Sequence, residues 1–289
     1  MGKSTLTVFL ADFFSSTRIA SKDAKIAVVD LDSQTSSATS LLGIHRVAEA
    51  KSNKQSISHM LKNIKKGDKE FFSNYLHKRE KGHTVTRRLP LGELWVMLQE
   101  RDRTIDIETD CNQRQCLNLV RLLTNALRKR FDIVFIDTPA NIDKRNKLTL
   151  AAMRASDYIL IPSESSRIAI NSMTDTFNMI QYVHGITDAR DPLPEIAGIV
   201  LNKTDMRTRQ YKLHHQELRD LAASQNSIVF KNYLPQAPTL STAADDSIDF
   251  STLREKYSTY YDHVRRVAIE LAKRCGYAIP NLGRTKTIF

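Results

Sequence analysis

The amino-acid sequence predicts an α/β fold, a doubly wound and mostly parallel sheet with helices on both faces. Short apolar runs alternate with segments whose apolar residues recur at helical spacing, and this alternation is typical of parallel sheets. Two of the runs end in aspartate, at the strand ends where such sheets bind ligands. We expect strands at residues 25–30, 94–98, 132–137, 158–162, 196–202 and 228–233. We expect helices at residues 3–20, 55–64, 68–80, 112–129, 145–154, 168–183, 208–223 and 252–274.

The first helix begins within a phosphate-binding pattern. Gly2-Lys3-Ser4-Thr5 matches the end of G-x-x-x-x-G-K-S/T, and a helical pattern follows at once. In that motif backbone N–H groups at a helix N-terminus hold phosphates, the lysine reaches the β- and γ-phosphates, and the hydroxyl ligates Mg²⁺. We therefore assign Gly2 and Lys3 to phosphate and Ser4 to the metal, with an ordinary helix N-terminus as the alternative. The strand that precedes this motif, and the first half of its loop, are missing from the sequence as printed.

Two strand ends carry the acidic residues that such a site needs. The apolar run from Ile26 ends in two carboxylates at alternate positions, Asp30 and Asp32. The run from Phe131 ends in Asp137, the Walker B pattern whose carboxylate holds Mg²⁺. Because the carboxyl ends of parallel strands meet at one edge, we expect Asp30 and Asp137 in the shell of the same ion.

Composition limits the class of protein. The formal net charge is +11, and residues 51–104 carry 13 basic and 6 acidic side chains. A basic surface of this kind attracts a polyanion such as DNA, and a solvated lysine-rich insertion is the alternative. No apolar stretch has the length of a membrane span, no secretory signal pattern is present, and three cysteines make no disulfide framework. We therefore expect a cytoplasmic protein with a single domain over residues 1–289, a basic variable segment at about 48–105 and a loose tail after residue 276.

The motifs together resemble those of the ParA/MinD family of deviant Walker A (P-loop) ATPases, and most closely its ParA-type partition ATPases. Residues 30–34 resemble the family's D-x-D-P-Q, with Ser33 in place of the proline. Further resemblances occur at residues 131–139, 158–164, 198–203, 234–235 and 240–243. The resemblance covers nearly the whole chain and is weakest between about residues 48 and 105.

The resemblance implies a nucleotide site with ATP and Mg²⁺ as cofactors. It implies that Thr5 meets the α-phosphate, that Asn202 lies near the base and that the Pro235 segment lines it. Asp32 would orient or activate the attacking water, and a turn acid or helix cap is the alternative for this residue. Asn202-Lys203-Thr204-Asp205 also spells the guanine-reading signature N-K-x-D. We favour ATP, since a four-residue match is weak beside the whole-chain pattern.

The family's signature lysine lies five residues before the lysine of the loop, a position that the printed sequence does not contain. Either Met1 is an internal residue of a K-G-G-M-G-K-S-T loop, or the chain starts here and is impaired. We favour the first, because a parallel sheet without its central strand loses hydrogen bonds on both neighbouring strands. From Met1 onward we expect weak ATP binding, since half of the backbone donors of the loop are absent.

The function that the resemblance implies is that of a ParA-like ATPase that segregates a plasmid or chromosome. ATP would join two subunits, the homodimer would bind DNA non-specifically at the nucleoid, and a ParB-like or adaptor protein would stimulate hydrolysis. The alternatives are a positioning ATPase for another cargo, a MinD-like membrane-associated regulator, and a degenerate homologue that does not hydrolyse ATP. No membrane partner is expected, because Gly276, Pro280 and Gly283 interrupt the C-terminal end.

Two basic surfaces are candidates for the DNA contact. Raw charge favours the 51–104 segment, with the cations Lys62, Lys65, Lys66, Arg87 and Arg88. The resemblance favours the C-terminal half, because DNA-contacting residues of such dimers lie in C-terminal elements. We therefore expect Arg207, Arg265 and Arg266 to contact DNA.

Overall fold

The computed structural model describes residues 2–19, 22–67, 72–80, 92–139, 143–186, 192–238, 240 and 250–277. The larger sheet has the strand order β4-β5-β3-β6, and β7 pairs with β8 in a second sheet. The bounds are β3 Lys25–Asp30, β4 His77–Lys78, β5 Glu93–Leu98, β6 Ile133–Asp137, β7 Tyr158–Ser163 and β8 Glu195–Leu201. All of these pairs are parallel except β4 with β5, so the prediction of a mostly parallel sheet is confirmed.

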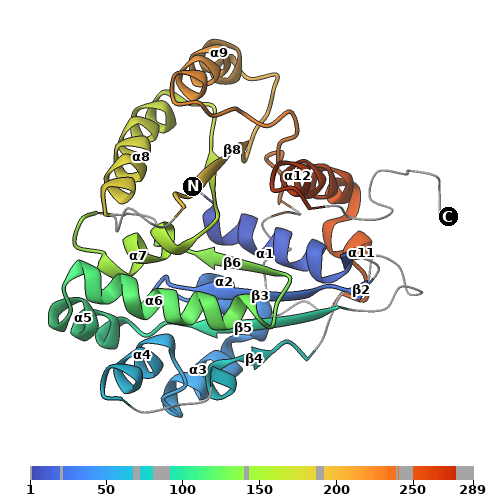
Figure 1. The fold of residues 1–289 in the computed structure, drawn as a ribbon. Helices are drawn as coiled ribbons and strands as arrows, with labels where there is room; N and C mark the ends of the chain where they lie inside the picture. The colour runs from blue at the N-terminus through green and yellow to red at the C-terminus, as the bar shows by residue number, and fades with distance from the viewer. Residues whose placement is uncertain are drawn as a thin grey trace.

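Helices cover both faces of the sheet (Figure 1). Alternate residues of β3 show this: Ile26 and Val28 belong to a core that contains α1 and α12, whereas Ala27 and Val29 belong to a core that contains α4 and α6. A third core joins β7 and β8 to α8 and α9. The helices are α1 Lys3–Ser15, α2 Ser36–Leu42, α3 Ile44–Ser52, α4 Ile57–Lys65, α5 Arg101–Asp110, α6 Gln113–Arg128, α7 Lys147–Ala155, α8 Arg167–Gly185, α9 Arg209–Ser224, α11 Leu253–Tyr257 and α12 Tyr261–Arg274. Within the described part of the chain, no helix has the length and apolar character that a bilayer crossing requires.

Four predicted elements differ from the structure. The helix expected at 3–20 ends at Ser15, and β1 Arg18–Ile19 follows it. The helix expected at 68–80 is instead a short 3-10 turn, η1 Phe72–Tyr75, followed by β4, and residues 68–71 lie outside the described part. β4 pairs with the outer edge of β5, and this pairing overrides the helical pattern. The strand expected at 228–233 is reduced to one bridge, between Ile199 and Val229. The helix expected at 252–274 is broken at Ser258, which adopts a positive φ of 48°.

Five elements have no counterpart among the predictions: α2, α3, α5 and the short hairpin of β1 Arg18–Ile19 with β2 Lys22–Asp23. The apolar pattern of α5 is weak, and Ile107 is its buried residue. Its acids contact two different neighbours: Asp106 pairs with Lys62 of α4, and the Glu108 carboxylate accepts the Leu148 backbone N–H of α7 (2.9 Å). Periodicity cannot detect a helix that is held largely by surface charge and by its neighbours.

Candidate functional site

Strands β3 and β6 place two aspartates side by side at the carboxyl edge of the sheet. Asp30 ends β3, Asp137 ends β6, and the two are direct partners in the parallel register. Both are buried. The Asp30 carboxylate accepts hydrogen bonds from the backbone N–H groups of Asp32 (3.1 Å) and Ala38 (2.8 Å). The Asp137 carboxylate accepts a hydrogen bond from the Ser37 hydroxyl.

The first turn of α1 brings a lysine and a hydroxyl to these acids. The Ser4 side chain is hydrogen-bonded to the Asp137 carboxylate. Burial lowers the pKa of the Lys3 ammonium, while the negative charges of Asp137 and Asp32 act in the opposite direction. The structure therefore gathers Lys3, Ser4, Asp32 and Asp137, with Asp30 beside them, in one polar cluster at the N-terminus of a helix. Helix N-termini favour anions, and the lysine adds a positive charge.

The two buried aspartates affect each other's protonation. Burial, together with the neighbouring Asp137, raises the pKa of Asp30 to about 7. Burial also raises the pKa of Asp137, although the hydrogen bonds from Ser37 and Ser4 oppose that rise. A cation placed between the two carboxylates would favour their charged forms.

We predict that the raised pKa of Asp30 makes stability depend on pH. Between the ordinary pKa of an aspartate and the raised pKa of about 7, Asp30 is protonated in the folded protein and ionised in the unfolded chain. Stability should therefore fall as pH rises from about 4 to about 7, by on the order of a few kcal/mol. Asp30→Asn should flatten this dependence, which urea unfolding midpoints across that range would measure. An equal pH dependence in both proteins would show that other groups cause it.

A second group of predicted site residues meets the start of α1. Asn202 directly follows β8, and its backbone N–H donates to the Ser163 carbonyl (2.7 Å). Gly2 adopts a positive φ of 85°, and a Cβ added there would lie 2.0 Å from the Asn202 amide nitrogen. Only glycine therefore fits at this position. Pro235 lies beside the same strand end, where it is bridged to Thr204.

The other residues predicted to contact the nucleotide or DNA lie in three different parts of the fold. Thr5 lies in the first turn of α1 and is partly exposed. Arg207 precedes α9 and pairs with Asp205 (2.9 Å). Arg265 and Arg266 lie on α12, where Arg266 is exposed. Arg207 lies before α9, whereas Arg265 and Arg266 lie on α12, and Figure 1 shows these two helices apart.

Helix α5 contacts two lysines of the alternative basic segment, and one of them is paired with an acid. Lys62 pairs with Asp106 at 3.8 Å, and the Lys65 ammonium donates to the Asp110 carbonyl at 3.1 Å. Lys66 is exposed, whereas Arg87 and Arg88 lie outside the described residues.

Sequence reasoning missed Ser37, which lies in the first turn of α2 and donates to Asp137. The available signal is the hydroxyl-rich run at residues 33–37, which follows the acidic strand end. A run of this kind offers several hydroxyls and does not indicate which one faces the second strand. The contact depends on the pairing of β3 with β6, which brings α2 over Asp137.

The donor set fits Mg²⁺ bound largely through a phosphate ligand. Across the described ranges, no group of three or more His, Cys, Asp and Glu side chains forms a metal site by itself. Mg²⁺ typically keeps waters and takes one or two protein oxygens beside substrate phosphates. The Ser4 hydroxyl and the Asp137 carboxylate are hard oxygen donors in contact with each other, with Asp30 adjacent.

Comparisons with known proteins point to one family. A family model described as AAA domain (AAA_31) matches residues 1–190. A ParA family protein of Mycoplasma pneumoniae is 27% identical over 158 residues, which is 52% of this chain and 54% of the relative. The chain thus spans about half the length of this curated relative.

Solved structures share the fold at low sequence identity. The Cyanothece McdA(D38A)–ATP complex has a TM-score of 0.69 at 15% identity, covering 96% of this chain and 92% of the other. The pNOB8 ParA bound to nonspecific DNA has a TM-score of 0.63 at 16% identity, covering 95% of this chain and 94% of the other.

Proposed function

The chain belongs to the AAA-domain family, among the ParA/MinD-type P-loop ATPases, and on this premise we propose that it is a ParA-like Mg²⁺-dependent ATPase. The observation that carries the proposal is the cluster of Lys3, Ser4, Asp30, Asp32 and Asp137 around the N-terminus of α1. A helix N-terminus with a lysine and paired carboxylates suits a phosphate ligand accompanied by a divalent cation. A solved structural neighbour is an ATP complex.

Each group at the site has a separate task in this proposal. Gly2 and the following backbone N–H groups, with the Lys3 ammonium, hold the phosphates, and Thr5 contacts the α-phosphate. Ser4, Asp137 and Asp30 would hold Mg²⁺, which would supply positive charge to the phosphates. Asp32 orients the attacking water from the loop after β3. Phosphoryl transfer needs mainly positioning and electrostatic stabilisation, and these side chains provide both.

The second group of residues, Asn202 and Pro235, would recognise the adenine base. Asn202 is buried against Gly2, and Pro235 is bridged to Thr204 at the same strand end. The Asn202 side-chain oxygen already accepts the Lys203 backbone N–H (3.0 Å), which fixes the orientation of its amide. The amide nitrogen is the group that faces the start of α1. We propose that Asn202 and Pro235 border the base.

We further propose that ATP joins two copies of the chain and that the dimer binds duplex DNA without sequence preference. A DNA-bound ParA is among the structural neighbours. Arg266 and Lys273 are exposed on α12 and lie two helical turns apart on one face. Arg274 instead stacks on Phe230 at 5.2 Å and lies 3.9 Å from Glu270. Release from DNA would follow hydrolysis stimulated by a ParB-like or adaptor protein, in the segregation of a plasmid or chromosome.

We predict that charge reversal of Arg207, Arg265 and Arg266 reduces the salt dependence of DNA binding. Each lost phosphate contact should lower the slope of log affinity against log salt by about one, equally on unrelated duplexes. Arg207 should contribute least, because Asp205 already offsets its charge. The measurement is a salt titration of the ATP-bound protein.

The matched control reverses the charge of three lysines on the alternative surface: Lys62, Lys65 and Lys66. An unchanged slope in the arginine variant with a reduced slope in this control would move the DNA site to the 51–104 segment. Absence of DNA binding by the intact ATP-bound protein would rule out the proposed role in segregating a plasmid or chromosome.

A further inference from the structure

Thr35, at the start of α2, has a backbone conformation that is unfavourable for its residue type. Its φ of 52° and ψ of 36° lie in the left-handed region, where a β-branched side chain crowds the backbone. Within the described ranges, the other non-glycine residues with a positive φ are Lys54, Lys203, Asn226 and Ser258. Those residues are exposed and none is β-branched, whereas Thr35 is buried, with 2% exposure. A conformation of this kind persists only where the surrounding structure holds it, and it is found most often at functional sites.

The hydroxyl of Thr35 does not cap the helix that it precedes. A threonine before a helix ordinarily accepts a hydrogen bond from a backbone N–H of the first turn, and the Thr35 side chain makes no such bond. Its oxygen instead accepts a hydrogen bond from the Lys51 ammonium at 3.1 Å. Lys51 is partly buried in the last turn of α3, and a hydrogen bond from a charged donor is stronger than one between neutral groups. Lys51 thus anchors the side chain that makes this conformation unfavourable.

Thr35 joins two segments of the proposed nucleotide site. On one side, its backbone N–H donates to the Asp32 carbonyl at 2.9 Å and closes the turn that follows β3. On the other side, its carbonyl accepts the Thr39 backbone N–H at 2.8 Å, at the start of α2. The backbone conformation of this one residue therefore sets the direction in which α2 leaves the turn that carries Asp32.

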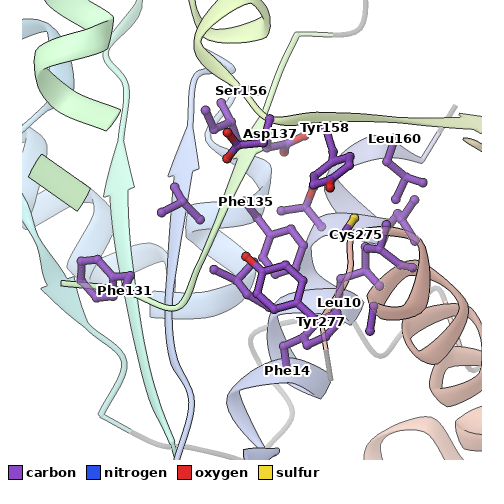
Figure 2. Close-up of a pocket in the computed structure, with 18 of the residues that line it drawn as sticks. Leu10, Phe14, Phe131, Phe135, Asp137, Ser156, Tyr158, Leu160, Cys275 and Tyr277 are labelled. Carbon is purple, nitrogen blue, oxygen red and sulfur yellow. The ribbon is translucent and has the colours of Figure 1, made fainter. Parts of the chain in front are cut away.

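The first turn of α2 supplies hydrogen bonds to both buried carboxylates. The Ala38 backbone N–H donates to Asp30 at 2.8 Å, and the Ser37 hydroxyl donates to Asp137. Figure 2 shows Asp137 at the wall of a cavity of about 440 Å³ whose lining also includes Phe135. Because the cavity leaves open space on one side of Asp137, its hydrogen bonds, including the one from Ser37, fix its position.

We propose that Lys51 and Thr35 are positioning residues for the metal site. The lysine holds the threonine in its left-handed conformation, and that conformation places the Ser37 and Ala38 donors on the two carboxylates. Neither side chain needs to touch the phosphates or the cation in this role. The inference deepens the proposed function and rests on it where Mg²⁺ is concerned.

A direct action of the Lys51 charge on the nucleotide is the alternative, and Thr35→Gly separates the two. Glycine adopts a positive φ without a steric penalty, so this variant keeps the conformation without help from the lysine. If Lys51 acts through Thr35, Lys51→Met has an effect in the unchanged chain and none in a Thr35→Gly protein. If its charge acts directly, Lys51→Met has the same effect in both.

The experiment compares the unchanged chain, Lys51→Met, Thr35→Gly and the double variant, with Lys54→Met as the matched control. Methionine keeps an unbranched stem and removes the charged donor. Lys54 is exposed just beyond the end of α3, so its substitution removes the same charge and leaves the Thr35 hydroxyl bonded. Two quantities are measured: amide exchange at Ala38 in nucleotide-free protein, and the Mg²⁺ concentration required for half-maximal ATP binding.

We expect Lys51→Met to speed exchange at Ala38 and to raise the Mg²⁺ requirement, each by about tenfold, the factor that a hydrogen bond to a charged group represents. ATP affinity at saturating Mg²⁺ should be the same as in the unchanged chain, because the phosphate contacts are not altered. Lys54→Met should change neither quantity. Thr35→Gly and the double variant should not differ from each other.

Three results would overturn the proposal. Equal exchange at Ala38 in Lys51→Met and the unchanged chain would show that the lysine does not hold α2. An effect of Lys51→Met that persists in the Thr35→Gly protein would show that the lysine acts without Thr35. Faster exchange with an unaltered Mg²⁺ requirement would show that the contact does not position the metal site. If none of the proteins binds ATP, the proposed function fails, and exchange at Ala38 still decides whether Lys51 holds α2 through Thr35.

Discussion

Asp12→Ala is expected to lower the free energy of unfolding by about 3–5 kcal/mol, because it leaves buried cations without their counter-charge. Asp12, on α1, is fully buried and accepts hydrogen bonds from the Lys256 ammonium (2.6 Å) and the Tyr257 hydroxyl (2.8 Å). It also pairs with Arg79, whose side chain is 6% exposed. The network ties α1 to the chain after β4 and to α11.

Urea unfolding followed by circular dichroism measures this effect. The matched control is Asp23→Ala, which removes an ion pair to Arg18 whose side chains are 57% and 41% exposed. Surface pairs of this kind contribute little, so the control should be close to the unchanged protein. A loss below about 1 kcal/mol for Asp12→Ala would show that Lys256 and Arg79 find other partners or water.

Asp32→Ala is expected to reduce ATP turnover by about 100-fold or more while ATP binding is retained, since general-base and water-positioning groups contribute on this scale. Asp32 is partly exposed at the carboxyl edge, and its charge acts on Lys3. Its carboxylate also accepts the Gln34 backbone N–H (3.0 Å), which is a structural role as a turn acid.

Asp32→Asn separates the two roles of this residue. The amide oxygen can still accept the Gln34 N–H, so the turn is kept, whereas the negative charge is lost. If the carboxylate acts on water, both variants lose turnover. If Asp32→Asn keeps the turnover of the unchanged chain and Asp32→Ala loses it, the role of Asp32 is only to hold the turn. Unchanged turnover in both variants would remove Asp32 from the mechanism.

The strands of the sheet were predictable because they are continuous apolar runs bounded by polar residues. β3, β5, β6, β7 and β8 each begin and end within one residue of the expected bounds. The pairing of Asp30 with Asp137 also follows from the pattern, since both acids end strands that point to one edge. The gathering of Lys3 with these acids follows from the helix that starts at that edge.

Other features could not be predicted, because they depend on contacts between residues that lie far apart in the sequence. The Asp12 network joins positions 12, 79 and 256, and each residue alone reads as an ordinary surface charge. The edge strand β4 exists because β5 offers a partner, although its own two residues have no strand pattern. The packing of Asn202 against Gly2 likewise arises from the return of β8 to the start of α1.

Mg²⁺-dependent ATP binding, measured by isothermal titration calorimetry, tests the central claim that the cluster around α1 is a nucleotide site. Lys3→Ala is compared with the unchanged chain and with Lys129→Ala, which removes an exposed lysine at the end of α6. We predict that the unchanged chain and the Lys129 variant bind ATP alike, weakly and only with Mg²⁺, because half of the backbone donors of the loop are absent. Lys3→Ala should weaken this binding further, at least tenfold, or about 1.4 kcal/mol. Equal affinity in all three proteins, or binding that is indifferent to Mg²⁺, would contradict the assignment of this site.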